Sequence, residues 1–329
     1  MLGKINGGLI GVFVLVCAGT MAQANAQQTS EWPSKPVRFI VPFPPGGSVD
    51  PLARLTGARL YASLGQQFVV DNRTGASGAI GTALGAKSAP DGYTYVFVFD
   101  THAVNPSLIS NLPYNTLKDL ASVMIVGTAP MVLTTHPTKS YKGFADLVKL
   151  AKAKPATLTF GTVGSGSLGH LAMMLAQNQA GLKMVHVPYK GGGPALTAAI
   201  GGEIDIAVTS VAVPVPHIRA GRLRAVVTTG EKRTQSIADT PTLIESGLPG
   251  FAAHAWWGIV TPAGIPGPVL NKMHSELTKA YNQPELHKQL REQFSMDLVI
   301  GTPEAMTKFV AVEIARWSKV VKEYGIRAD

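Results

Sequence analysis

Glycine-rich loops are the parts of this sequence best suited to bind a ligand. The apolar run Val37 to Val41 predicts a buried strand, and Pro44-Pro-Gly-Gly47 follows it. Ser48 or Asp50, followed by Pro51, indicates the capped start of a helix. The two glycines let a ligand approach main-chain N–H groups beside a helix N-terminus, which carries partial positive charge. The stretch therefore predicts an anion-binding position, with an ordinary strand-to-helix turn as the alternative.

A second loop, Gly164-Ser-Gly-Ser-Leu-Gly169, matches the G-x-G-x-x-G pattern of dinucleotide-binding sites. Such sites also need an acidic residue at the end of the next strand to bind the ribose, but the chain has Val187-Pro-Tyr-Lys190 there. A serine-bearing loop at a helix N-terminus suits one small carboxylate better. We therefore expect no nucleotide cofactor.

Nucleophilic and metal chemistry are poorly supported. Gly75-Ala-Ser-Gly-Ala79 is one residue short of the G-x-S-x-G nucleophile elbow, and the eight histidines form no ordered Ser, Asp, His pattern. They also lack H-E-x-x-H or any close pair, so we expect no zinc site. His102 and His170 lie beside the expected loops, where each either faces a ligand or packs. We expect a binding protein rather than an enzyme, with a secreted hydrolase using Ser77 as the alternative.

The elements that must position these loops alternate between strands and helices, which is typical of a largely parallel sheet. Loops at the carboxyl ends of strands lie where open α/β sheets bind ligands. The expected strands that end in such loops are 37–41, 67–72, 94–99, 158–162, 184–188 and 204–208.

The chain has room for two lobes. Ser122 to Ala129 and Met131 to Thr135 predict two strands separated by a break at Pro130, where the chain would cross into a second lobe. A strand from His254 to Val260 would return to the first, with Trp256 and Trp257 on opposite faces. We expect an α/β fold with a ligand cleft between the lobes. Lobe 1 would comprise residues 27–131 and 255–329, and lobe 2 residues 132–254.

The N-terminus has the features of a signal peptide. An apolar run from Leu9 to Ala18 is followed by Ala24-Asn-Ala26, a small-x-small cleavage pattern, which predicts a signal peptide over residues 1–26. The run is too short to span a membrane. It holds the only cysteine, Cys17, so the mature chain would have no thiol for disulfides or nucleophilic chemistry.

The net charge favours anionic solutes as ligands. The sequence has 29 Lys and Arg against 20 Asp and Glu, and the basic residues are dispersed rather than clustered with aromatics. Nucleic-acid binding would require such clusters, so we expect no nucleic acid partner.

Four segments together carry a resemblance to a known family. The sequence closely resembles the Bug or TctC-like periplasmic solute-binding proteins of tripartite tricarboxylate transporters over the whole mature chain. The matching segments are Pro42 to Asp50, Val187 to Ala195, Pro216 to Gly221 and Glu245 to Gly250. The resemblance implies a two-lobed fold of the periplasmic-binding-protein type II kind, located in the periplasm. It also implies a monomer that needs no cofactor or metal and delivers a small carboxylate to membrane permease subunits. A receptor that serves a signalling partner is a further alternative.

The resemblance also implies which residues hold the ligand. They lie on the glycine loops, at the strand ends and on the first turns of the helices that follow. The expected ligand-binding residues are Phe43, Gly46, Gly47, Ser48, Ser77, Gly78, Thr101, His102, Thr162, Ser165, Gly166, Ser167, His170, Thr209, Ser210 and Val211.

One departure from the family pattern concerns Thr209 and Ser210. Many amino-acid-binding members carry aspartate and asparagine at these positions, where an acid meets a ligand ammonium. Two neutral hydroxyls remove both that attraction and the repulsion of a second carboxylate. We therefore expect a ligand without an amino group, and a dicarboxylate in particular. Phe43, Val211 and a tryptophan could provide apolar walls, so an aromatic acid such as terephthalate and an aliphatic C4 to C6 diacid both stay open.

Overall fold

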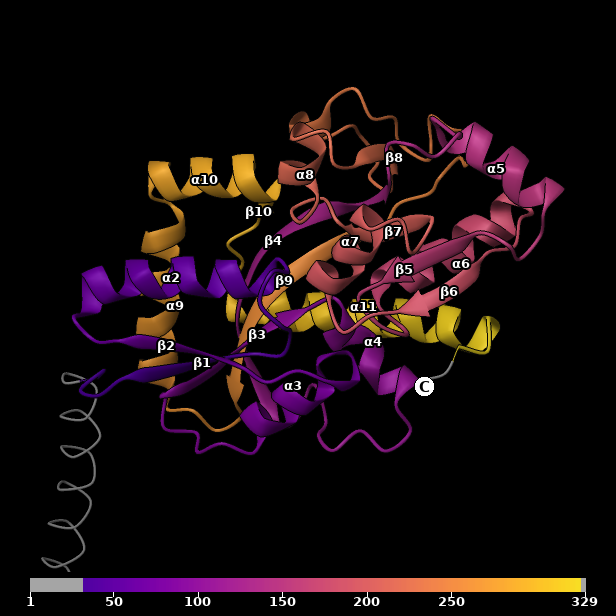
Figure 1. Ribbon diagram of the computed structural model, residues 1–329. Helices are drawn as coiled ribbons and strands as arrows, with labels where there is room; N and C mark the ends of the chain where they lie inside the picture. The colour runs from indigo at the N-terminus through magenta and orange to yellow at the C-terminus, as the bar shows by residue number, and fades with distance from the viewer. Residues whose placement is uncertain (1–31, 327–329) are drawn as a thin grey trace, which may run out of the picture.

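The computed structural model describes residues 32 to 326 (Figure 1). The predicted signal peptide lies outside this range. The strands are β1 Val37–Val41, β2 Phe68–Asn72, β3 Thr94–Phe99, β4 Leu120–Thr135, β5 Thr159–Thr162, β6 Val185–Pro188, β7 Ile206–Ser210, β8 Arg224–Thr228, β9 His254–Pro262 and β10 Asp297–Leu298. The helices are α2 Val49–Leu64, α3 Ala79–Ala86, α4 Thr101–Leu108, α5 Phe144–Ala153, α6 Leu168–Ala180, α7 Gly192–Ile200, α8 Val215–Arg219, α9 Gly267–Tyr281, α10 Pro284–Phe294 and α11 Pro303–Glu323, with 3-10 turns η1 Ala76–Gly78 and η2 Gln235–Ile237.

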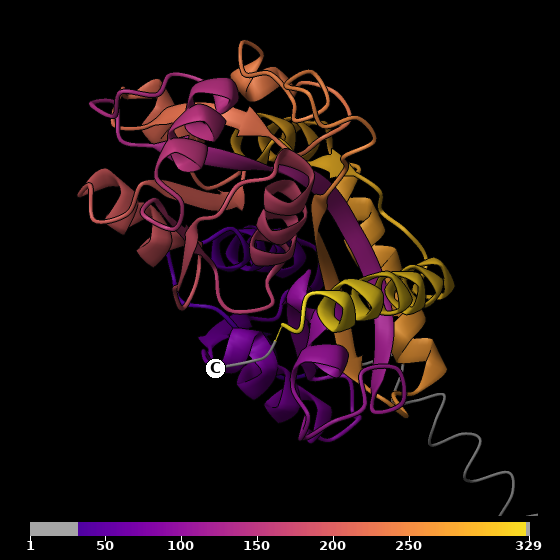
Figure 2. The ribbon, with the colours of Figure 1, turned by 90° about the vertical axis from the view of Figure 1, so that its right-hand side faces the viewer.

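The protein is an α/β molecule of two lobes that share strand β4. In lobe 1, β2, β1 and β3 are parallel, and β9 joins β3 antiparallel. In lobe 2, β6, β5 and β7 are parallel, and β8 pairs with β4. The first half of β4 pairs with β9 and β10, and its second half with β7 and β8. In Figure 2, β4 is the long purple strand that runs beside the orange strand β9.

The predicted break at Pro130 is wrong, because β4 is one continuous strand of sixteen residues. Pro130 pairs with His254 of β9, whereas Met131 pairs with Ser210 of β7. Proline lacks an N–H, and here it lies where the strand changes partner, so the sheet tolerates it. Its carbonyl still accepts the N–H of Val211 at 3.1 Å. Pro130 therefore lies where β4 changes its partner strands and does not end the strand.

Both faces of the lobe 1 sheet are covered by helices. Phe39 and Trp257 belong to the larger core, which includes residues of α2 and α9, while Ile40 and Trp256 belong to a second core with residues of α3 and α11. The two tryptophans are 0% and 1% exposed. Their opposite orientation is the one that strand geometry requires. No helix within residues 32 to 326 combines the length and the apolar character needed to cross a membrane.

Candidate functional site

A small cavity lies between the lobes. Its walls come from the carboxyl ends of strands and the loops that follow them. Lobe 1 contributes Phe43, Gly47, Ser48, Val49 and Phe99, and lobe 2 contributes Val163, Gly192, Ser210 and Val213. Most of these side chains are apolar, and none is charged.

Two helix N-termini meet at this cavity. Helix α2 begins at Val49 and α7 at Gly192, and a Cβ placed on Gly47 would lie 3.9 Å from the nitrogen of Gly192. Among the described residues, no hydrogen bond uses the N–H groups of Gly46, Gly47 or Ser48. Each helix end carries partial positive charge and favours an anion by about 0.3 to 2 kcal/mol. The cavity therefore provides main-chain donors from both lobes.

Two serine hydroxyls add side-chain donors. Ser210 is 2% exposed, and its Oγ has no partner among the residues described. Ser48 occupies the N-cap position of α2 but makes no capping bond; its Oγ accepts the indole N–H of Trp257 at 3.1 Å. The proton of the Ser48 hydroxyl thus stays available to a ligand acceptor. Because a buried hydroxyl without a partner is costly, Ser210 in particular indicates a bound polar group.

The loop before α2 is held from behind by Asn72. Its Nδ2 donates to the carbonyl of Phe43 and to Oδ1 of Asp50, both at 2.9 Å. Asp50 also binds the guanidinium of Arg54, whose side chain is 55% exposed. The charge of Arg54 is therefore neutralised outside the cavity, and the site relies on neutral donors.

The lobes touch each other on both sides of the cavity. Oγ of Ser77 donates to the carbonyl of Ser165 at 2.9 Å, and Ser77 has the left-handed φ of 50°. Ser77 is fixed in turn by Asn105, whose Nδ2 donates to its carbonyl at 3.2 Å. On the other side, a Cβ on Gly193 would lie only 3.1 Å from the carbonyl carbon of Gly46. The structure therefore shows the lobes closed over the cavity.

The N-terminus of α6, predicted as a carboxylate-binding position, already has partners within the protein. The N–H of Leu168 donates to Oδ1 of Asp100 at 3.3 Å, across the lobe boundary. Ser167 receives the N–H of His170 on its Oγ, and the N–H of Gly166 donates to Nδ1 of His170 at 3.1 Å. Asp100 is 1% exposed, and burial raises the pKa of its carboxyl to about 8. An acid of the chain itself therefore occupies the place expected for the ligand.

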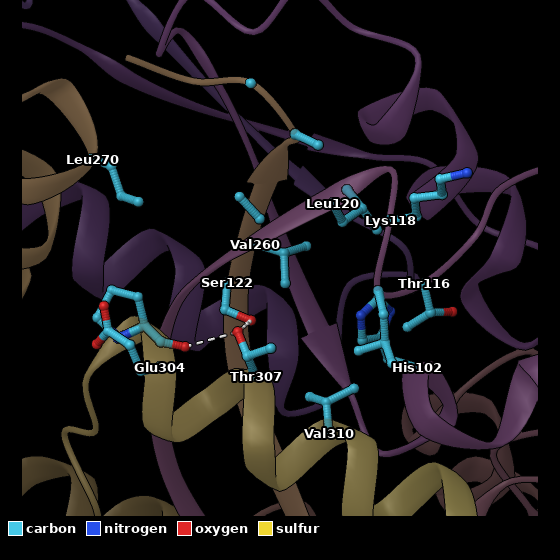
Figure 3. A pocket seen from close by; sticks show the side chains of 15 residues that line it. His102, Thr116, Lys118, Leu120, Ser122, Val260, Leu270, Glu304, Thr307 and Val310 are labelled. Carbon is cyan, nitrogen blue, oxygen red and sulfur yellow. Dashed lines mark hydrogen bonds between the residues drawn. The ribbon is translucent and has the colours of Figure 1, made fainter. Parts of the chain in front are cut away.

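His102 lies in a different pocket, on the face of the sheet that α11 covers (Figure 3). Thr116, Ser122 and Thr307 also line this pocket. The ring of His102 is 3% exposed and meets Trp256 edge-on, with centroids 6.4 Å apart. Burial lowers the pKa of His102 to about 4, so the imidazole is neutral.

Apart from His102, the predicted site residues fall into two groups. Four line the cavity, namely Phe43, Gly47, Ser48 and Ser210. Strand alternation separates Ser210 from Thr209, whose hydroxyl donates to the carbonyl of Ser210 at 3.3 Å instead of facing the cavity. The others surround it as backbone contacts, loop supports or buried packing residues: Gly46, Ser77, Gly78, Thr101, Thr162, Ser165, Gly166, Ser167, His170 and Val211.

Sequence reasoning missed Val49, Phe99, Val163, Gly192 and Val213 as cavity-lining residues. The signal for Gly192 was present, because glycines 191–193 follow a strand and precede a helix, as Gly46 and Gly47 do. The four apolar residues gave no such signal, since a valine beside a cavity has the same pattern as one in the core. The described residues contain no group of three His, Cys, Asp or Glu side chains that could hold a metal ion.

A family model described as the tripartite tricarboxylate transporter family receptor matches residues 52–326. The chain belongs to this receptor family. TctC receptors are periplasmic binding proteins rather than enzymes, so the hydrolase alternative for Ser77 is wrong. They bind small carboxylates and work with membrane components of a transporter.

Among its relatives is the protein BugT of Bordetella pertussis, which is 36% identical over 97% of both chains. An R. palustris protein whose structure was solved with adipate is 32% identical, with a TM-score of 0.87 over 90% of this chain and 99% of that one. MatC from Rhodopseudomonas palustris, solved with bound malate, is 29% identical, with a TM-score of 0.82 over 88% of this chain and all of the other. The two-lobed fold of this TctC receptor is therefore that of carboxylate-binding neighbours.

Proposed function

We propose that this receptor binds a dicarboxylate without an amino group in the cavity between its lobes and delivers it to the permease of a tripartite tricarboxylate transporter. The observation that carries the proposal is the convergence of the N-termini of α2 and α7 on Ser210, a buried hydroxyl without a partner. An acid group placed there would accept main-chain N–H groups from both lobes. Its binding would therefore favour the closed arrangement.

The walls of the cavity restrict what the rest of the ligand can be. Phe43, Phe99, Val49, Val163 and Val213 present apolar surface, and no carboxylate lines the cavity to pair with an ammonium group. A hydrocarbon body between acid groups fits such walls, whereas an amino group would lose its hydration without a partner. Adipate and malate, bound by structural neighbours, are diacids of this kind. We propose aliphatic C4 to C6 diacids and terephthalate as the ligands.

The lobe boundaries are part of the proposal. We place lobe 1 at 27–131 and 255–329 and lobe 2 at 132–254, with export through a signal peptide over 1–26. The change of partner along β4 at Pro130 and Met131 supports the first boundary. In this arrangement β4 is the shared strand about which the lobes would open to admit a ligand.

Calorimetric titration of the mature protein with adipate, malate, terephthalate and glutamate tests the proposed function. We expect at least one diacid to bind and glutamate to bind at least about tenfold more weakly, because its ammonium finds no acid in the cavity. A bound ligand at one hundred times its dissociation constant would also add about 2.7 kcal/mol of stability, visible as a thermal shift. Binding of glutamate but of no diacid would contradict the proposal.

A further inference from the structure

Two histidines of lobe 2 form a stacked pair behind the binding loop. His170 of α6 and His186 of β6 have ring centroids 3.8 Å apart and planes inclined by 11°. Phe160 of β5 stacks on His186 at 5.0 Å and lies 6.2 Å from His170, so the three rings form a compact cluster. His170 was expected to face the ligand, but its ring packs in this cluster.

Hydrogen bonds tie both rings to the loop between residues 162 and 167. Nδ1 of His170 accepts the N–H of Gly166 at 3.1 Å, so this nitrogen carries no proton. The hydroxyl of Thr162 donates to the carbonyl of Gly164 at 3.0 Å, so its oxygen accepts from Nε2 of His186 at 2.8 Å. These bonds define the protonation state of each of the two nitrogens, and the bond from Gly166 requires the ring of His170 to be neutral.

The loop held in this way reaches the cavity directly. Val163 lines the cavity, and the carbonyl of Ser165 accepts the hydroxyl of Ser77 from the other lobe. A shift of this loop would therefore move one wall of the cavity and break a contact between the lobes. The stacked pair acts on the ligand only through this loop.

Protonation would oppose the observed arrangement. A proton on Nδ1 of His170 would face the N–H of Gly166 donor to donor, and the loop would lose its acceptor. Charging both rings would place two positive charges about 4 Å apart, which is repulsive even at the high effective dielectric of a partly exposed site. An ordinary imidazole changes charge near pH 6.5.

Charged groups near the pair lie outside the helix and strands that carry it. Within the described chain, α6, β5, β6 and β7 carry no Lys, Arg, Asp or Glu. Lys183 and Tyr324 line a pocket together with His186, and Lys183 adds to the positive charge there. Asp100 contacts Leu168 at the start of α6, and Asp205 beside β5 is already paired with Lys139 at 2.6 Å.

We propose that His170 and His186 are positioning residues that hold the lobe 2 side of the binding site only while His170 is neutral, so that ligand affinity falls in acid. The inference rests on the proposed function, since it requires the cavity to be the binding site. The chemistry is a proton equilibrium at an imidazole, and no other co-reactant is involved.

The matched variant is His170→Gln, whose side-chain oxygen can accept the N–H of Gly166 without titrating. Affinity for adipate is measured by calorimetry for both proteins between about pH 8 and pH 5, where imidazole changes charge. Protonation of adipate lowers both affinities equally, so this effect cancels in the ratio of the wild-type affinity to the variant affinity. Below the pKa of the pair we expect this ratio to fall by about tenfold per pH unit. His136→Gln, on the turn between β4 and α5, is the control and should follow the wild type.

Amide hydrogen exchange at Gly166 without ligand gives a second measurement. We compare the protection of the Gly166 amide in the wild type with its protection in His170→Gln. This ratio should fall over the same pH range in which nuclear magnetic resonance shows the two histidine rings titrating. Equal pH profiles and unchanged Gly166 protection would overturn the inference while leaving the proposed function intact. Absence of adipate, malate and terephthalate binding at every pH, with Gly166 protection still pH dependent, would instead overturn the proposed function and the effect on affinity, and would leave only the support of the loop by the pair.

Discussion

Oδ1 of Asp100 in lobe 1 accepts the N–H of Leu168 in lobe 2 at 3.3 Å, so the chain caps α6 with its own acid across the lobe boundary. The contact exists only where the lobes meet, and Phe99, the preceding residue, lines the cavity. Closure is therefore stabilised by a bond that involves no ligand. The consequences of this contact for affinity and for pH dependence can be separated by substitution.

Replacing Asp100 by alanine should weaken ligand binding. The N–H of Leu168 would be left without its acceptor in the closed form, at a cost of about 1 to 3 kcal/mol, or roughly a 5- to 150-fold loss of affinity for adipate. Asp100→Asn retains an acceptor oxygen and should lose much less. Titration calorimetry measures both variants, with the exposed Asp239→Ala as control. Equal affinities for the alanine variant and the wild type would show that the contact plays no part in closure.

The same acid should make stability depend on pH. Burial raises the pKa of Asp100 from 3.8 to about 8, so the folded state favours the neutral form. This contribution is fully present below about pH 4 and is lost as pH rises through 8. Compared with the wild type, Asp100→Asn should therefore gain relative stability between pH 4 and pH 8 in urea unfolding experiments. A constant difference between the two proteins over this range would contradict the assignment.

His102 should act in the opposite direction. Burial lowers its pKa from 6.5 to about 4, so the unfolded chain takes up a proton before the folded one does. Stability from this group is present above pH 6.5 and is lost as pH falls toward 4, by on the order of 3 kcal/mol in total. His102→Gln should flatten that part of the stability profile, measured by urea unfolding at each pH. His136→Gln should not.

Closure should require glycine at position 193. A Cβ there would lie 3.1 Å from the carbonyl carbon and 3.2 Å from the oxygen of Gly46, both backbone atoms that cannot move aside. Gly193→Ala should therefore lower adipate affinity severalfold while leaving the unfolding free energy equal or higher, since alanine favours helix by up to about 1 kcal/mol. Gly201→Ala is the control, because its Cβ would contact only atoms of lobe 2 and would not affect closure. Affinity unchanged in Gly193→Ala would contradict the closed arrangement as the binding state.

Ser210 should determine the preference for ligands without an amino group. Ser210→Ala removes one hydrogen bond and should cost about 0.5 to 1.5 kcal/mol of adipate binding. Ser210→Asp introduces an acid into the cavity and should reverse the preference toward glutamate. Thr209→Val is the matched control because Thr209 bonds a carbonyl and does not line the cavity. Competition calorimetry with adipate and glutamate measures these effects. A larger effect of Thr209→Val than of Ser210→Ala would show that the hydroxyl of Thr209, and not that of Ser210, determines the preference.

The βα rhythm and the glycine loops were predictable because they depend on local properties. Alternation of apolar runs with turn residues predicted β1, β2, β3 and β9 within a residue or two, and glycines next to a helix start located the loop before α2. The same local signals misled at Pro130, whose effect on a strand depends on which neighbour it meets. They also missed α10, and they placed Thr101 and His102 in a loop although α4 begins there.

The sequence by itself determined the kind of hydrogen-bond donor available, namely main-chain N–H groups at glycine loops and neutral hydroxyls. It also determined that Trp256 and Trp257 lie on opposite faces of one strand. Only the tertiary structure decided which of those donors remain open to a ligand. The α6 loop is occupied by Asp100 and His170, whereas α2 and α7 face each other across a cavity. The physical reason is that a hydrogen bond is satisfied by whichever group lies nearest in space, and these partners lie far apart in the chain.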